Sequence, residues 1–108
     1  MNKVGNGEVI SYLLENIILA LPSTWRYSYY RTTNHTEIDL VLEGPHKSCW
    51  AVEIKKTSAP SLSKGFFSAA EDIQATHKFV VYSGTERFPM PKKTEAIGIV
   101  EFLGLLRK

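Results

Sequence analysis

Apolar side chains near the amino end of the chain recur at the spacing of a helix. The stripe is formed by Val9, Ile10, Leu13, Leu14, Ile17, Ile18 and Leu21. A wide apolar face with a period near 3.6 residues predicts an amphipathic helix from about Gly7 to Leu21. Asn6 is a suitable N-cap for this helix, and Pro22 ends it because proline cannot continue the hydrogen-bond ladder.

Three strand-like runs follow this helix, and turn residues separate them. The runs are Trp25–Arg31, Glu37–Leu42 and Trp50–Lys55. Short turns at Thr32–His35 and Glu43–His46 connect consecutive runs, which predicts an antiparallel meander.

Alternation along the second and third runs assigns their side chains to faces. The second run places Ile38, Leu40 and Leu42 on one face and Glu37, Asp39 and Val41 on the other. The third run places Val52 and Ile54 opposite Glu53 and Lys55. The apolar face of each run is expected to pack on the core.

The second half of the chain alternates helix and strand patterns. The expected elements are a helix at Leu62–Thr76, a strand at Lys78–Tyr82, a loop at Gly84–Glu95, a strand at Ala96–Val100 and a closing helix at Glu101–Lys108. A helix that connects two strands of one sheet usually makes those strands parallel. The expected fold class is therefore α/β, with one domain over residues 1–108 and a mixed sheet flanked by helices in the order α-β-β-β-α-β-β-α. The expected core residues are Leu13, Ile17, Ile38, Leu40, Val52, Ile54, Phe66, Val80 and Val81.

The composition is that of an ordinary globular domain, with 44% hydrophobic and 22% charged residues in a chain of 108. The longest apolar stretch, Ile17–Leu21, is too short to cross a bilayer, and no signal peptide is recognisable. We therefore expect a cytoplasmic protein with no membrane partner. Cys49 is the only cysteine, which excludes an internal disulfide and a cysteine-based zinc site. The net charge of +2 permits a polyanionic partner without requiring one.

Charged side chains share one face of two neighbouring predicted strands. Residues two apart in a strand point the same way, so Glu37 projects with Asp39, and Glu53 projects with Lys55. In a meander, Asp39 and Glu53 would converge with Lys55 beside them. Converging carboxylates repel unless a cation lies between them, and their oxygens suit Mg²⁺ or Mn²⁺ better than Zn²⁺. The spacing predicts a metal site able to polarise a phosphodiester, with Lys55 orienting water or neutralising developing charge.

The same alternation has a plainer interpretation. Charged residues at every second position are typical of the solvated face of an amphipathic strand. Glu53 and Lys55 would then form a surface ion pair that contributes under ~1 kcal/mol to stability. Spacing alone leaves both interpretations open.

Two segments, HTEIDLVLE at 35–43 and AVEIKKT at 51–57, resemble the motif strands of the PD-(D/E)XK nuclease superfamily. Asp39 matches the Asp of that motif, and Glu53 and Lys55 match its Glu-X-Lys. The resemblance implies a restriction-endonuclease-like fold and a Mg²⁺ or Mn²⁺ ion held by Asp39 and Glu53. It also implies a third acid from the helix before the first strand, and Glu15 stands at that place. Catalysis would then involve all four residues.

Three further residues flank the predicted site. Lys56 and Lys64 are the natural contacts for a substrate phosphate, although both are equally explained as solvated residues at the ends of elements. His35 precedes the Asp39 strand, where it would reach a substrate phosphate or remain an exposed turn histidine.

A longer resemblance runs from LLENIILAL near the amino end to IVEFL near the carboxyl end. The chain is similar to a domain of unknown function, with the same nuclease-like fold, at the carboxyl end of prokaryotic AAA-type ATPases. The sequence contains no G-x-x-x-x-G-K-[ST] phosphate loop, so an ATPase module would be a partner or a separate part of a longer protein. Two functions are expected: a metal-dependent nuclease-like domain acting on nucleic acid, DNA foremost, or a catalytically silent interaction or DNA-binding module of such an ATPase.

Overall fold

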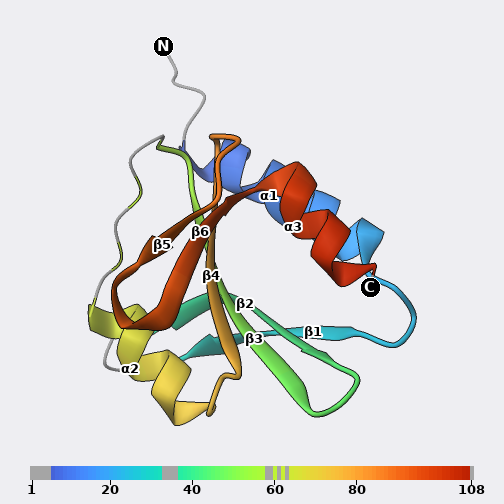
Figure 1. The fold of residues 1–108 in the computed structure, drawn as a ribbon, viewed down its shortest axis with the longest axis vertical. Helices are drawn as coiled ribbons and strands as arrows, with labels where there is room; N and C mark the ends of the chain where they lie inside the picture. Colours follow the sequence, from blue (N-terminus) through green and yellow to red (C-terminus); the bar gives the residue numbers. More distant parts are fainter. Residues whose placement is uncertain (1–5, 33–36, 58–59, 61, 63, 108) are drawn as a thin grey trace.

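The computed structural model describes residues 6–32, 37–57, 60, 62 and 64–107 of the chain (Figure 1). Its elements are α1 (Asn6–Ala20), β1 (Arg26–Arg31), β2 (Glu37–Gly44), β3 (Ser48–Lys55), α2 (Lys64–Asp72), β4 (His77–Tyr82), β5 (Phe88–Met90), the 3₁₀ turn η1 (Pro91–Lys93), β6 (Thr94–Gly98) and α3 (Ile99–Leu106). Within the described part of the chain, no helix is long and apolar enough to cross a bilayer.

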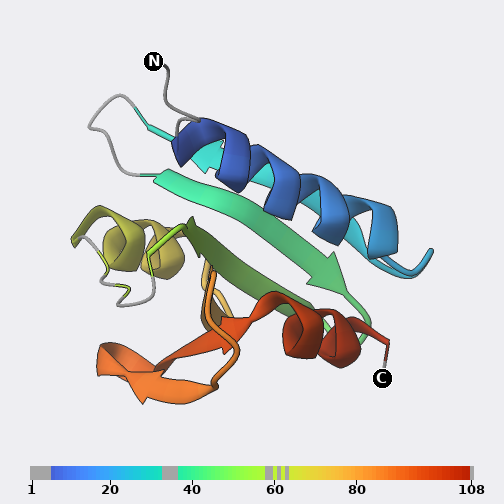
Figure 2. The same ribbon diagram turned by 90° about the horizontal axis from the view of Figure 1, so that it is seen from above.

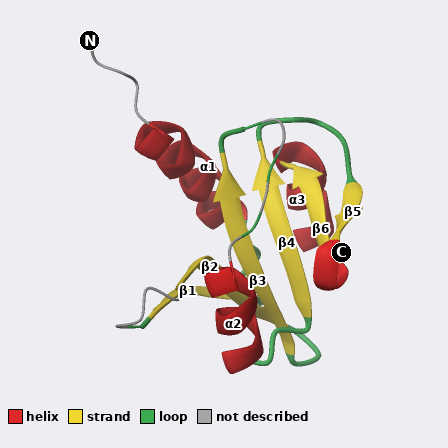
Figure 3. Ribbon diagram, turned by 90° about the vertical axis from the view of Figure 1, so that its left-hand side faces the viewer, coloured by secondary structure: helices red, strands yellow, loops and turns green. Residues whose placement is uncertain are grey.

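The strands form one six-stranded mixed sheet in the order β1-β2-β3-β4-β6-β5. The meander β1-β2-β3 is antiparallel, whereas β3, β4 and β6 run parallel to one another. Helix α2 is the crossover from β3 to β4, which is why these two strands are parallel. The carboxyl ends of β3, β4 and β6 meet at one edge of the sheet (Figure 3). The α/β class with a mixed sheet and flanking helices is confirmed.

The helices divide between the two faces of the sheet. Helices α1 and α3 lie side by side over one face (Figure 1), and α2 covers part of the other, so that β2 separates α1 from α2 (Figure 2). The cluster beneath α1 and α3 contains Leu13, Ile17, Leu40, Leu42, Trp50, Val52, Ile54, Phe79, Val81, Ile97, Phe102 and Leu106. The cluster beneath α2 contains Ile38, Val41, Ala51, Phe66, Ala69 and Ala70. All nine residues expected in the core are buried.

Strand β2 departs from the strict alternation expected for it. Ile38 packs beneath α2 with Val41, whereas Leu40 lies in the cluster on the opposite face. The cause is a bulge, because Ser28 of β1 pairs with Val41 while Tyr30 pairs with Ile38. One extra residue of β2 is thus accommodated at Asp39–Leu40, and it shifts the alternation by one position. The expectation that Ile38 shares a face with Leu40 is wrong for this reason.

The segment Gly84–Glu95, expected to be a loop, contains a short edge strand. Phe88–Met90 pairs with β6, and Pro89 is tolerated there because an edge strand need not donate on its outer side. The last strand and the closing helix also begin earlier than expected, since Gly98 is the N-cap of α3 with an extended backbone. The β-branched pair Ile99–Val100 is strand-like in isolation, but it forms the first turn of the helix.

Candidate functional site

Asp39, Glu53 and Lys55 lie at the edge where β2 begins and β3 ends. The two strands are antiparallel, and the register that pairs Leu40 with Val52 brings Asp39 beside the end of β3. This is the edge at which the parallel strands β3, β4 and β6 also end (Figure 3). Ligands of open α/β sheets commonly bind outside the carboxyl ends of such strands.

The Asp39 carboxylate is held by the backbone of the neighbouring strand. Its Oδ2 accepts a hydrogen bond of 2.9 Å from the backbone N–H of Ile54, just beyond the last β2–β3 pair, Leu40 with Val52. Partial burial raises the pKa of Asp39, and the charge of Glu37 raises it further. The Ile54 N–H and the Lys55 ammonium oppose this rise. The backbone of β3 therefore fixes one oxygen of the Asp39 carboxylate.

Glu53 is the most perturbed acid of the site. Its side chain is only 16% exposed, and burial, followed by the negative charge of Asp39, raises its pKa to about 7. The ammonium of Lys55 lies 3.3 Å from Oε2 of Glu53 and lowers the same pKa in part. Val52 and Ile54 face α1 and α3, so Glu53 and Lys55 project on the side of the sheet that α2 covers. Sequence alternation predicted this placement.

Glu37 and Arg31 add to the electrostatics of the site, although neither was singled out as a site residue. They are directly paired across β1 and β2, with 3.9 Å between Arg31 Nε and Glu37 Oε2. Glu37 raises the pKa of both Asp39 and Glu53, and Arg31 lowers that of Asp39. Glu37 could have been found from the sequence, because it stands two residues before Asp39 and so projects from the same face of a regular strand.

The structure does not bring Glu15 to the two carboxylates. Leu13 and Ile17 are buried in α1, and Glu15, midway between them, is exposed on the solvent side of the helix. Helix α1 also lies over the face of the sheet opposite to Glu53. The expected third acid is therefore misplaced, because the same periodicity that buries Leu13 turns Glu15 away.

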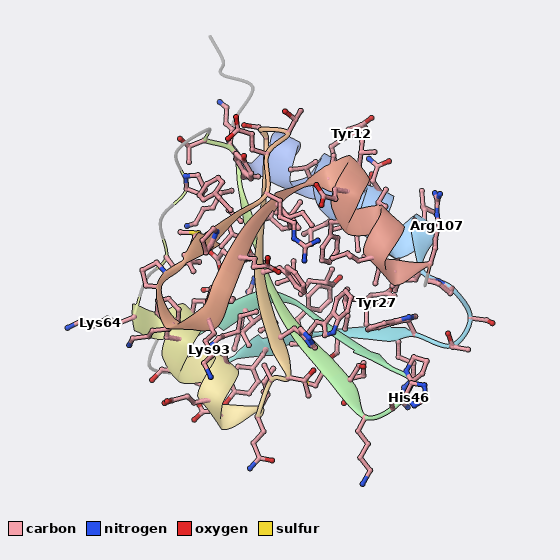
Figure 4. The ribbon with its side chains drawn as sticks, viewed as in Figure 1. Tyr12, Tyr27, His46, Lys64, Lys93 and Arg107 are labelled. Atoms are coloured by element: carbon pink, nitrogen blue, oxygen red, sulfur yellow. The ribbon has the colours of Figure 1, made fainter. Side chains whose placement is uncertain are left out.

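The expected phosphate contacts are partly in place. Lys56 is exposed directly after β3, and its backbone carbonyl accepts a hydrogen bond from Ser83 Oγ, which ties the ends of β3 and β4 together. Lys64 begins α2, and its side chain points into solvent (Figure 4). His35 lies outside the described residues.

The chain matches the family described as "Domain of unknown function (DUF4143)" over residues 9–102. It belongs to this family. Uncharacterized proteins of Mycobacterium bovis and Mycobacterium tuberculosis are each 35% identical to it over 86 residues, which are 80% of this chain and 19% of theirs. The chain thus spans about a fifth of the length of the curated relatives it matches. No solved structure matches it.

The donor set of this DUF4143 domain fits a hard divalent cation. Magnesium is commonly held by one or two carboxylates, while water and substrate oxygens complete its shell. Asp39 and Glu53 supply two such groups. Burial and mutual repulsion raise their pKa values, and a cation between them would stabilise the charged carboxylates against both effects. No cluster of three or more His, Cys, Asp or Glu suited to a metal occurs among the described residues. The residues therefore fit Mg²⁺ or Mn²⁺ better than an ion that needs a full protein shell.

Glu53→Gln should stabilise the DUF4143 domain at alkaline pH when a chelator is present. The folded protein holds a proton on Glu53 up to about pH 7, whereas the usual pKa is 4.5. Between these values the folded state binds more protons than the unfolded state, so the free energy of unfolding falls as pH rises. At about 1.4 kcal/mol per pKa unit, the rise from 4.5 to about 7 corresponds to a loss of roughly 3 kcal/mol.

Glutamine mimics the protonated acid, so the variant should escape this loss. We expect equal stability near pH 4.5 and an advantage of the variant that grows to roughly 3 kcal/mol at pH 8, measured by urea unfolding. Glu43→Gln, an exposed position at the other end of β2, is the matched control and should give no such trend. A variant less stable than the wild type at pH 8 would mean that the ion pair with Lys55 outweighs burial.

Proposed function

We propose that this domain binds Mg²⁺ or Mn²⁺ at Asp39 and Glu53 and acts as a nuclease-like domain on the phosphodiesters of nucleic acid, DNA foremost. The observation that carries the proposal is the meeting of two partly buried carboxylates with the Lys55 ammonium at one edge of the sheet. Buried carboxylates of high pKa next to a cationic side chain are typical of functional sites.

The order of elements supports the nuclease-like assignment. Asp39 lies on β2 and Glu53-Ile54-Lys55 ends β3, within the order α1-β1-β2-β3-α2-β4 that the PD-(D/E)XK resemblance implies. The extra residue in β2 places the Asp39 carboxylate against the backbone of Ile54, between the two other residues of the motif. The first and second motif strands are therefore neighbours in the arrangement that the proposal needs.

Each residue has a distinct task in the proposed reaction. A bound cation supplies Lewis acidity toward a phosphodiester oxygen and lowers the pKa of a bound water. Asp39 and Glu53 hold the cation, and both must be deprotonated to do so. Lys55, within contact of Glu53, is placed to neutralise charge that develops on the phosphate. Lys56, Lys64 and His35 are the proposed substrate contacts.

A second candidate is a catalytically silent interaction module of an AAA-type ATPase. Two observations favour it: the curated relatives are about five times longer than the matched region, and Glu15 points away from the acids. A domain that serves only for docking has no need of a third metal ligand.

The two candidates separate in one experiment on the purified chain. We expect calorimetry to detect binding of Mn²⁺ or Mg²⁺, and gel assays to detect cleavage of labelled DNA or RNA that a chelator stops. Asp39→Ala should weaken cation binding at least about tenfold and abolish cleavage, because it deletes a charged ligand. Glu43→Gln, at the far end of the same strand, should change neither property.

Two outcomes would contradict the proposal. Cleavage that survives in both Asp39→Ala and Glu53→Gln would come from a contaminating nuclease. Absence of cation binding at millimolar concentrations, with DNA present, would favour the docking module.

A further inference from the structure

A cavity of about 440 Å³ lies beside α2, on the flank that α2 turns toward β4 and the β5–β6 connection. It is lined by Lys64, Phe67, Ser68, Glu71, Lys78 and Lys92. Four of these residues come from α2, and Phe67 and Ser68 each lie three or four positions from both Lys64 and Glu71, so that the four form one stripe of the helix. This stripe is distinct from the buried stripe of Phe66, Ala69 and Ala70.

The lining is strongly cationic. It contains three lysine ammonium groups and a single carboxylate, that of Glu71. Two of the ammonium groups lie over the same aromatic ring, since Lys92 Nζ is 4.9 Å and Lys78 Nζ is 5.9 Å from the ring centroid of Phe67. Like charges gathered around one cavity repel each other, and an anion placed among them removes that repulsion.

The backbone of the β5–β6 connection contributes to this arrangement. Lys92 and Lys93 both have left-handed conformations, with φ of 59° and 61°. Residues other than glycine seldom adopt this region, and two in succession are costly. The turn they form delivers the Lys92 ammonium to Phe67 on α2, from an element far along the chain.

The cavity opens on the same side of the sheet as the carboxylate site. Lys78 of β4 pairs with Ala51 of β3, and Ala51 lies beneath α2. Glu53 and Lys55 follow Ala51 on this face at steps of two residues. A polyanionic chain bound in the cavity would thus share a face with Glu53 and Lys55.

We propose that this cavity binds one unpaired nucleotide of a nucleic-acid strand. Its phosphates bind Lys64, Lys78 and Lys92 and draw the last two ammonium groups off the ring of Phe67, where the base takes their place. The inference rests on the proposed function and names its substrate class as single-stranded. Proteins that bind single strands combine cationic side chains along the backbone with aromatic rings on which bases stack.

The dimensions and the ring both disfavour a duplex as the occupant. A cavity near the lower end of the usual range for ligand pockets suits a group of nucleotide size. The face of a base in a duplex is covered by its neighbours in the stack, so Phe67 has a partner only when the base is unpaired.

The test is fluorescence anisotropy with a short fluorescein-labelled oligothymidylate, free or annealed to its complement, in a buffer that contains EDTA. Phe67→Leu keeps an apolar side chain but removes the ring, and should weaken single-strand binding about tenfold or more. The double variant Lys78→Gln/Lys92→Gln should weaken binding and reduce the magnitude of the salt slope by about 1.4, since each lost phosphate contact accounts for about 0.7.

Lys47→Gln is the matched control and should bind like the wild type. Lys47 is an exposed lysine in the β2–β3 turn next to His46, which lies on the opposite side of the molecule from Lys64 in Figure 4, and it also has a left-handed backbone. Because the assay contains EDTA, it measures binding in the cavity without the divalent cation that cleavage at the carboxylate site requires. Failure of the carboxylate site and failure of the cavity are therefore separable.

Three results would overturn the inference. The first is equal binding by Phe67→Leu and the wild type. The second is duplex binding as tight as single-strand binding. The third is displacement of the oligonucleotide by inorganic tripolyphosphate with equal efficiency in the wild type and in Phe67→Leu. That result would mean that the cavity binds anions in general and that Phe67 does not contact a base.

Discussion

Replacing Leu40 with alanine is expected to lower the free energy of unfolding by about 2–5 kcal/mol. Leu40 is fully buried in the cluster beneath α1 and α3, and it follows the bulge that turns Asp39 toward β3. The substitution removes apolar contacts and leaves a cavity that the neighbouring strands cannot fill without moving. Ile54→Ala, at the paired strand and on the same face, should cost a similar amount.

Leu19→Ala is the control for this pair. The Leu19 side chain is 85% exposed on α1, so its truncation should change stability by less than about 0.5 kcal/mol. Urea unfolding followed by circular dichroism gives all three values under the same conditions. Losses below about 1 kcal/mol at both Leu40 and Ile54 would show that the faces of β2 and β3 are reversed.

Local periodicity was sufficient to predict most of the fold. The stripe of α1 and the alternation of β3 are properties of short segments, and each held because one side of the element packs on a core. The edge strand Phe88–Met90 was not predictable in the same way, since three residues with a central proline carry no periodic signal. The bulge in β2 depends on how β2 pairs with β1, which no single segment reveals.

In the candidate site, too, the residues predicted from local spacing were placed correctly. Asp39, Glu53 and Lys55 were predictable because they lie on adjacent strands joined by a tight turn, so that the register follows from local spacing. Glu15 was assigned from resemblance to a family pattern, against the helical periodicity that placed Leu13 and Ile17 in the core. Where the two sources disagreed, the periodicity gave the correct orientation.

The cavity beside α2 could not be predicted from spacing at all. Phe67 and Lys78 belong to elements whose order is evident, but Lys92 comes from a connection that the sequence presents as a loop. Its ammonium lies over Phe67, at a turn where two successive residues adopt left-handed conformations. A cationic site of this kind depends on how distant elements pack together. In the sequence alone, an adjacent pair such as Lys92 and Lys93 looks the same whether it lines a site or faces solvent.

Lys55→Met should separate catalysis from cation binding in the carboxylate site. The ammonium lies 3.3 Å from Glu53 and cannot ligate a cation, so its removal deletes no metal ligand. It does remove a positive charge that lowers the pKa of Glu53, and at neutral pH a proton would then compete more strongly with the cation. Binding should therefore be compared at about pH 8.5, above the pKa of about 7 that Glu53 has in the wild type, so that a proton competes less with the cation.

Under these conditions we expect Mn²⁺ affinity in Lys55→Met to equal or exceed that of the wild type, because a repelling charge is gone. Cleavage should fall roughly 100-fold or more, the usual scale for losing one group that assists proton transfer or stabilises charge in the transition state. Lys55→Arg keeps the charge and should retain part of the activity, whereas Lys47→Met should behave as wild type. Parallel losses of cation affinity and cleavage in Lys55→Met would instead make Lys55 a structural partner of Glu53, whose ion pair holds the carboxylate in place for the metal.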